Sequence, residues 1–231
     1  VEQIEFANVI ILNKIDLITK SNLNTIRSII HGLNAKARII ETTLSKVSTT
    51  DIMNTGLFNI EEAQNHALWA QELYNPDNHV PETDEFGITS FVYRAREPFD
   101  PEKIHNFFNE ECPGVIRTKG FFWISSRPNF VGEVSQAGAF VKHQGIGRWW
   151  AAVSESQWPT DEIFKKKLNN IWIKGYGDRR QEIVFIGLKN QINENSIRNK
   201  LNSYLVKDYL TNNNKKHSLN DPFPSWFNKD S

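Results

Sequence analysis

Cysteine is almost absent from this sequence, because Cys112 is the only one among 231 residues. A single thiol excludes an internal disulfide framework and fits a reducing compartment. The first residues, VEQIEFA, also lack the basic and then apolar layout of a secretory signal peptide. These two features predict a cytoplasmic protein.

Long apolar runs and net charge are lacking too. No stretch of about eighteen apolar residues occurs, so no membrane-spanning helix is expected. Lys plus Arg and Asp plus Glu both number 27, which gives a formal net charge of zero. The chain as a whole therefore has no built-in attraction to nucleic acid or to an anionic membrane, although a local patch is compatible with this balance. We expect neither nucleic acid nor a membrane among the partners.

The first part of the chain has the pattern of an α/β fold. Residues 6–12 form a short apolar run, which is typical of a parallel strand buried on both faces. Residues 22–33, after a cap at Ser21, carry apolar side chains three and four apart and predict a helix. Residues 37–41 predict a second strand, which completes a βαβ unit. Because the first strand starts so close to Val1, we expect the chain to be either a piece of a longer protein or the product of a reading frame that starts late.

A change of character divides the chain into two domains. Residues 51–53 and 60–73 predict two more helices of the first domain. The stretch 72–86 has two prolines, five acidic side chains and no apolar periodicity, which indicates a linker. The expected organisation is an α/β part at 1–73, a linker at 74–86, a second domain at 87–210 and a polar tail at 211–231.

The second domain is predicted to be α+β. Alternating side chains predict a strand at 87–95, and Asp100 with Pro101 predicts the capped start of a helix at 102–110. Further strands are expected at 115–126, 130–141, 148–153 and 181–188, with a turn at 127–129 and a closing helix at 196–210. This order favours a mostly antiparallel sheet with helices on one face. In the tail, Phe223 and Trp226 are the side chains expected to dock.

The sequence Asn13-Lys14-Ile15-Asp16 follows the first predicted strand directly. Ligands of open α/β sheets bind beyond the carboxyl ends of strands. The carboxylate of Asp16 can accept two parallel hydrogen bonds, which guanine offers through its ring N–H and amino group and adenine does not. Asn13 can either tie loops together or meet the acceptor edge of guanine, and Lys14 can lay its alkyl stem along the base. The spacing is that of the N-K-x-D signature of GTPases.

A simpler interpretation is that these residues only end a strand and begin a turn, because Asn and Asp are common in turns. The position of the motif in a βαβ unit favours guanine recognition. The segment 42–46, which follows the second predicted strand and includes Ser45 and Lys46, would then supply the second wall of the guanine site.

Two other parts of a GTPase site are missing from the 231 residues. No G-x-x-x-x-G-K-[ST] phosphate loop occurs, and no strand ends in an aspartate placed to hold a nucleotide magnesium ion. Phosphate contacts dominate nucleotide affinity in P-loop proteins. We therefore predict that this chain alone binds GTP weakly and does not hydrolyse it.

Several blocks of sequence resemble the CobW family of GTP-dependent metallochaperones, in particular its zinc-responsive bacterial members. These blocks are VEQIEFANVIILNKIDLI, GITSFVYRAREPF, RTKGFFWISSRP, VGEVSQAG, GRWWAAV, GDRRQEIVFIG and DPFPSW. The resemblance implies an α/β remnant of a P-loop GTPase domain followed by an α+β domain, GTP as the cofactor, and zinc or another divalent metal as cargo. It also implies two partners, a client metalloprotein and the N-terminal GTPase half that this chain lacks. Full-length relatives are GTPases.

The metal ligands cannot be carried over from the resemblance. The C-x-C-C motif of the family matches no part of this chain, and the neighbours of Cys112 have no ligand spacing. Many relatives have a His-rich interdomain linker, whereas here only His66 and His79, thirteen residues apart, flank that region. The sequence thus identifies no metal site.

Two alternatives concern the aromatic sheet of the second domain. Residues 119–124, KGFFWI, partly match the K-G-F-[GA]-F-V signature of single-stranded RNA-binding modules. Phe122 stands where that signature has a small residue and Ser126 where it has an aromatic one, which weakens the match. The other alternative is a protein-interaction module whose sheet docks a client or covers the nucleotide domain.

Overall fold

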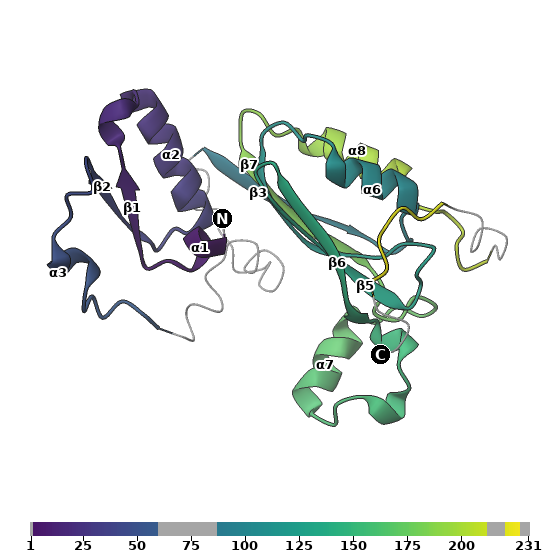
Figure 1. The fold of residues 1–231 in the computed structure, drawn as a ribbon. Helices are drawn as coiled ribbons and strands as arrows, with labels where there is room; N and C mark the ends of the chain where they lie inside the picture. Colours follow the sequence, from purple (N-terminus) through teal and green to yellow (C-terminus); the bar gives the residue numbers. More distant parts are fainter. Residues whose placement is uncertain (1, 60–86, 212–219, 227–231) are drawn as a thin grey trace. The chain divides into compact units, whose positions relative to one another are not determined.

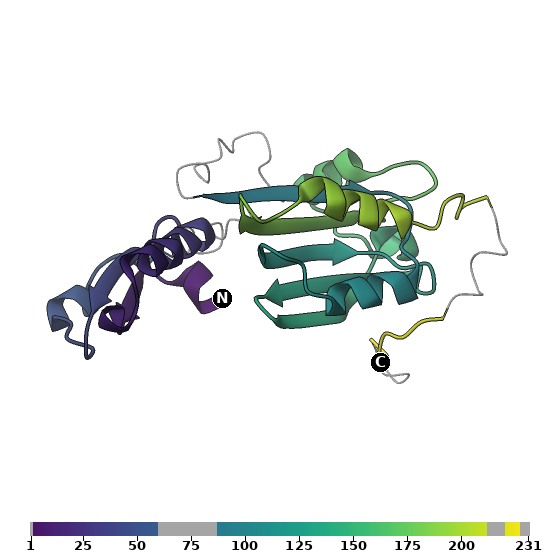
Figure 2. The ribbon, with the colours of Figure 1, turned by 90° about the horizontal axis from the view of Figure 1, so that it is seen from above.

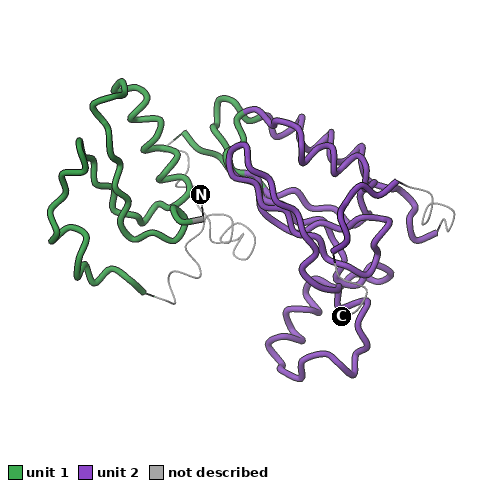
Figure 3. Tube along the Cα trace, in the orientation of Figure 1, with its two compact units in different colours: residues 1–91, 114–116, 186–192 green, residues 92–113, 117–185, 193–231 purple. Residues whose placement is uncertain are grey.

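The computed structural model describes residues 2–59, 87–211 and 220–226. The chain forms two compact units, one made of residues 1–91, 114–116 and 186–192 and the other of residues 92–113, 117–185 and 193–231 (Figure 3). The helix predicted at 60–73 and the linker predicted at 74–86 lie outside the described residues.

The first unit contains the predicted βαβ arrangement. Strands β1 and β2 are parallel, and Val9 pairs with Arg38 at one end and Asn13 with Thr42 at the other. Helix α2 crosses between them (Figure 1). The elements are α1 (Glu2–Phe6), β1 (Val9–Asn13), η1 (Ile15–Leu17), α2 (Lys20–Leu33), β2 (Arg38–Thr42) and α3 (Thr49–Ile52).

The strand predicted at 6–12 starts three residues later than expected, because residues 2–6 are helical. The side chain of Asn34 donates 2.8 Å hydrogen bonds to the carbonyls of Ile4 and Ala7, which fixes the end of α1 as a turn. The helix predicted at 22–33 begins at Lys20, and its cap is Thr19 rather than Ser21. In both cases a side-chain hydrogen bond to the backbone sets the boundary.

The second part of the chain is a five-stranded antiparallel sheet in the order β3-β7-β4-β5-β6. Two helices, α6 and α8, lie on the same face of this sheet, and a third, α7, lies at its end (Figures 1 and 2). The elements are β3 (Ile88–Ala95), α6 (Pro101–Asn109), β4 (Val115–Phe122), β5 (Phe130–Ala137), β6 (Phe140–Arg148), α7 (Glu162–Ile171), β7 (Gln181–Leu188) and α8 (Glu194–Ser203). The predicted α+β fold is therefore confirmed.

Aromatic side chains join the helices to the sheet. Phe107 of α6 meets Phe185 of β7 edge-on at a ring-centroid distance of 6.4 Å, and Phe108 meets Phe122 of β4 at 5.2 Å. Phe122 and Phe185 are 0% and 1% exposed, respectively. Such buried aromatic pairs contribute large apolar areas and favour edge-to-face geometry, so this layer forms the main core of the sheet.

Several expected element boundaries in the second domain were wrong. The single strand predicted at 130–141 is two strands, because Gly138 adopts a left-handed φ of 58° and the chain reverses there. The strand predicted at 148–153 is absent. Residues 150–152 form a short 3-10 helix, whose first amides, Trp150 and Ala151, donate to the carboxylate of Asp178 at 3.0 and 2.9 Å. The closing helix ends at Ser203, not at 210.

Helix α7 was not predicted from the sequence. The two adjacent tryptophans near this helix differ in burial, since Trp149 is 3% exposed and Trp150 is half-buried. Among the helices that the structure describes, none is long and apolar enough to cross a membrane.

Candidate functional site

Two loops meet at the carboxyl end of the parallel pair β1 and β2. The register pairs Asn13 with Thr42, so both strands end at the same edge. The loop that continues from β1 contains Lys14 and Asp16, and the loop that continues from β2 contains Ser45. This edge is where open α/β sheets place their ligands.

The side chain of Asn13 ties these two loops together. Its Nδ2 donates to Oγ of Ser45 at 2.8 Å, and its Oδ1 accepts from the backbone N–H of Ser45 at 3.0 Å. Both ends of the carboxamide are therefore engaged across 32 positions of sequence. Of the two roles that the sequence left open for Asn13, the structure places it in the loop-tying one.

The second loop has its own internal support. Thr42, which is buried, donates its hydroxyl to the carbonyl of Lys46 at 2.8 Å, and the amide of Lys46 donates to the carbonyl of Thr43 at 3.2 Å. Thr42 is the last residue of β2 and lies in the segment 42–46 that the sequence indicates as the second wall of the site.

Backbone strain is concentrated in the same two loops. Lys14 has a φ of 63°, and the consecutive residues Leu44 and Ser45 have φ values of 52° and 56°. A left-handed conformation costs a residue with a Cβ about 1–2 kcal/mol, so surrounding bonds must hold it. The two hydrogen bonds between Asn13 and Ser45 supply such support. Strained residues of this kind often occur at ligand sites.

The carboxylate of Asp16 is exposed at this edge. Asp16 lies in the short helix η1, which the amide of Leu17 closes by donating to the carbonyl of Lys14 at 3.1 Å. Lys14 and Lys46 are exposed as well. Two large apolar side chains, Leu17 and Leu44, are 72% and 78% exposed. The site thus presents a free carboxylate together with apolar surface, a combination suited to a flat polar base.

A neighbouring carboxylate is already paired. The hydrogen bond from the Arg27 guanidinium to Glu41 lowers the pKa of that carboxyl and raises the pKa of Arg27. Glu41 is the residue before Thr42, so it is the acidic group nearest in sequence to the second loop. Of these two carboxylates, Asp16 is the one without an ion pair among the residues that the structure describes.

The structure identifies no metal centre in the part of the chain that it describes. No group of three or more His, Cys, Asp or Glu side chains is found among those residues. Burial raises the pKa of the Cys112 thiol, which disfavours the metal-binding thiolate. His105 and His143 come together at a ring-centroid distance of 5.4 Å, which their sequence spacing did not indicate. His66 and His79 lie outside the described residues.

Two family models match this chain. The model described as "Cobalamin synthesis protein cobW C-terminal domain" matches residues 88–205, from the start of β3 to just beyond α8. The model described as "CobW/HypB/UreG, nucleotide-binding domain" matches residues 1–41, which include the loop with Asp16.

Individual relatives agree with the family models. The chain is 40% identical over 210 residues to "Zinc-regulated GTPase metalloprotein activator 1" of Dictyostelium discoideum, covering 90% of this chain and 43% of that protein. It is 28% identical over 136 residues to a zinc chaperone of Mycobacterium tuberculosis, covering 58% of this chain and 34% of that one. The chain thus spans less than half the length of these relatives.

A solved structure, the zinc-bound YjiA GTPase from E. coli, aligns with a TM-score of 0.40 at 20% identity, covering 88% of this chain and 54% of that one. The family assignment rests on the sequence matches, which cover residues 1–41 and 88–205. The chain belongs to the CobW family.

Proposed function

We propose that this chain supplies the guanine-recognition part of a GTP-binding metallochaperone, through Asn13, Lys14, Asp16, Ser45 and Lys46. The observation that carries the proposal is the pair of hydrogen bonds from Asn13 to Ser45 beside an exposed Asp16. The match of residues 1–41 to a nucleotide-binding domain supports the same assignment.

Each side chain has a distinct role in this proposal. The Asp16 carboxylate accepts hydrogen bonds from the ring N–H and the amino group of guanine. Adenine lacks this donor pair, so Asp16 sets the base preference. Asn13 is a positioning residue, since both ends of its carboxamide are hydrogen-bonded to Ser45. Lys14 and Lys46 flank the base with their alkyl stems.

The residues present fit the base of GTP but not its phosphates. The exposed carboxylate and the strained, bonded loops make a base site, whereas the sequence has no G-x-x-x-x-G-K-[ST] loop to hold phosphate. No residue of this chain is therefore assigned to phosphate or magnesium.

Isothermal titration of the 231-residue chain tests this division. We expect GTP to bind with a dissociation constant of about 1 mM or weaker, because only base contacts contribute. The dissociation constants of GMP and GTP should agree within roughly threefold, since no phosphate-binding loop contacts the outer phosphates of GTP. No GTP hydrolysis should be detected. Micromolar binding of GTP, or a clear preference of the chain for GTP over GMP, would contradict the assignment.

Zinc is proposed as the cargo, and a cytoplasmic client metalloprotein as its recipient. The proposal extends to this chain what the names of two relatives say, "zinc-regulated GTPase metalloprotein activator" and "zinc chaperone". No ligand set for zinc is assigned, because none was found among the described residues.

The structure disfavours the RNA-binding alternative. An RNA platform needs exposed rings on which bases can stack. Phe122 and Trp123 are 0% and 1% exposed, and Phe121 packs against the buried cluster of Trp123, Trp149 and Tyr209. The protein-interaction alternative is supported by a separate feature of the second domain.

A further inference from the structure

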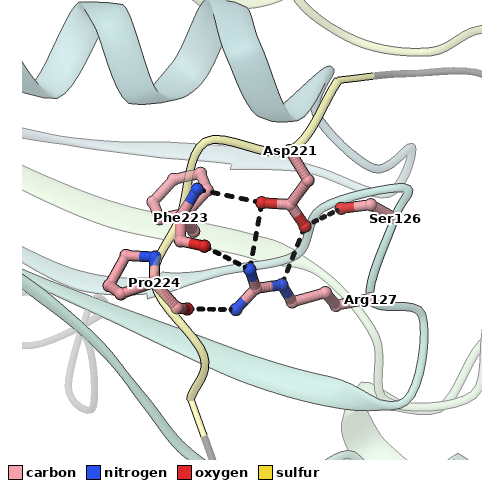
Figure 4. A network of polar contacts seen from close by, with 5 residues as sticks. All are labelled: Ser126, Arg127, Asp221, Phe223 and Pro224. Carbon is pink, nitrogen blue, oxygen red and sulfur yellow. Dashed lines mark hydrogen bonds and ion pairs between the residues drawn. The ribbon is translucent and has the colours of Figure 1, made fainter.

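A short segment near the end of the chain, Asp221–Trp226, is held by one arginine. The guanidinium of Arg127 donates from Nε to Asp221 Oδ2 at 2.8 Å and from Nη2 to Asp221 Oδ1 at 3.1 Å (Figure 4). It also donates to the carbonyl of Phe223 at 2.6 Å and to that of Pro224 at 2.7 Å. The hydroxyl of Ser126 adds a 2.6 Å bond to Asp221 Oδ2. One arginine thus contacts a side chain and two backbone carbonyls of the segment.

The segment buries a single side chain. Phe223 is 5% exposed, and its ring lies 5.0 Å from His105, 5.0 Å from His143 and 5.5 Å from Phe122, measured between centroids. Trp226 is half-buried with its ring 4.6 Å from the guanidinium carbon of Arg127. In contrast, Pro222, Pro224 and Ser225 are exposed. The segment therefore contacts the domain through two aromatic side chains, of which Phe223 is the more deeply buried, while its other side chains stay at the surface.

The docking surface consists of His105, Phe122, Ser126, Arg127 and His143. It combines a planar, bidentate cation with a cluster of rings contributed by α6, β4 and β6. The Arg127 side chain is only 17% exposed with the segment in place. A shielded guanidinium strongly favours a carboxylate partner. The surface is thus selective for an acidic residue followed two positions later by an aromatic ring.

All the recognition elements of the segment are local in sequence. The amide of Phe223 donates to Asp221 Oδ1 at 3.0 Å, which fixes the spacing between carboxylate and ring. Prolines on both sides of Phe223 restrict the backbone to extended conformations, so little conformational entropy is lost on docking. A peptide from another protein with the same pattern carries the complete set of contacts.

We propose that this docking surface is a peptide-recognition site. The chain's own Asp221–Trp226 fills it in the structure, and an extended segment of the same chemistry on a partner protein binds there when the chain's own segment leaves. The ligand class is a peptide with a carboxylate, an aromatic ring two residues later and flanking prolines. Because the segment is tethered, it competes for the docking surface at an effective concentration of about 1 mM. It therefore weakens the binding of a partner peptide without preventing it.

The test uses the full chain and a fluorescein-labelled peptide of sequence NDPFPSW, followed by fluorescence anisotropy. In a variant that combines Asp221→Ala with Phe223→Ala, the internal ligand is disabled and the peptide should bind saturably to one site. Binding to the unsubstituted chain should be at least about tenfold weaker, because the internal segment competes.

Two matched substitutions distinguish specific recognition of the peptide from nonspecific binding. Adding Arg127→Lys to the double variant should weaken peptide binding about tenfold or more, because lysine cannot make the bidentate contact. Adding Arg148→Lys, at an exposed position at the end of β6, should leave it unchanged. A peptide with asparagine in place of its aspartate should bind as poorly as the Arg127→Lys combination.

Cooperative thermal unfolding first shows that the double variant is folded. The proposal fails if the folded double variant binds no peptide or binds it no better than the unsubstituted chain does. It also fails if Arg127→Lys has no effect on peptide binding. If the double variant does not fold, the single change Asp221→Asn removes the ion pair at constant size. That variant must then bind the peptide more tightly than the unsubstituted chain does, and equal binding overturns the proposal.

Discussion

Replacing Gly120 with alanine will lower the free energy of unfolding of the second domain by about 3 kcal/mol or more. Gly120 lies within β4 at a φ of 152°, which residues with a Cβ rarely adopt. A Cβ placed there would lie 2.2 Å from the carbonyl oxygen of Glu182 and 2.7 Å from the Cα of Ile183. Both atoms belong to the backbone of the adjacent strand β7, which cannot move without disturbing the middle of the sheet.

Gly138 provides the matched control. It also has a positive φ, 58°, but a Cβ there would meet nothing within 4 Å. Gly138→Ala should therefore cost only the backbone term, about 1 kcal/mol. Urea unfolding followed by tryptophan fluorescence measures both changes, with equal m-values confirming that midpoints can be compared. If the two variants lose equal free energy of unfolding, the close approach of β4 to β7 does not depend on glycine at position 120.

Asp16→Asn will reverse the base preference of the first loop. Guanine presents two N–H donors to the Asp16 carboxylate, whereas xanthine replaces the amino donor with a carbonyl acceptor. An asparagine side chain offers one acceptor and one donor, which complements xanthine. Each hydrogen bond to a charged group is worth about 1.5–3 kcal/mol, so binding of GMP should fall by at least about tenfold while that of xanthosine monophosphate rises.

Saturation-transfer NMR with millimolar GMP and xanthosine monophosphate measures this change, because binding by the chain alone is expected to be weak. Asp51→Asn is the control. Asp51 is also a carboxylate of the first unit, but it is paired with Arg38 at 2.7 Å outside the two loops. That variant should keep the preference for GMP. An unchanged preference in Asp16→Asn would remove Asp16 from the base site.

Parts of the fold follow from local sequence alone. The strand predicted at 181–188 is found at those residues, because a run of large apolar side chains there is buried on both faces. Helix α6 starts where Asp100 and Pro101 predict, and Asp100 accepts from the amides of Glu102 and Lys103 at 3.1 and 3.2 Å. The cap and the first turn are set by neighbouring residues, so sequence patterns are sufficient.

Other parts depend on contacts that a local pattern does not contain. The 3-10 turn at Trp150 exists because Asp178, 28 positions away, accepts its amide. The strand predicted at 115–126 ends at Phe122, and the buried side chain of Gln181 there accepts from the amide of Trp123 at 2.9 Å and donates to its carbonyl at 2.8 Å. Alternation of side chains cannot reveal a partner on another strand.

The candidate site shows the same division. The motif around Asp16 indicated the first loop and its position after a strand, which the parallel pairing of β1 and β2 explains. The role of Asn13 required the structure, because its partner Ser45 is 32 residues away and adopts a left-handed backbone. Sequence alone therefore proposed the ligand, and the structure supplied the arrangement that holds the loops.

The central claim is that the two loops at the ends of β1 and β2 bind guanine and not adenine. Amide chemical-shift mapping of the isotope-labelled chain with GMP and with AMP, each at millimolar concentration, tests it most directly. We predict that GMP shifts the amides of residues 13–17 and 43–46 and that AMP leaves them unchanged. Equal shifts with both nucleotides, or shifts by GMP confined to other residues, would contradict the claim.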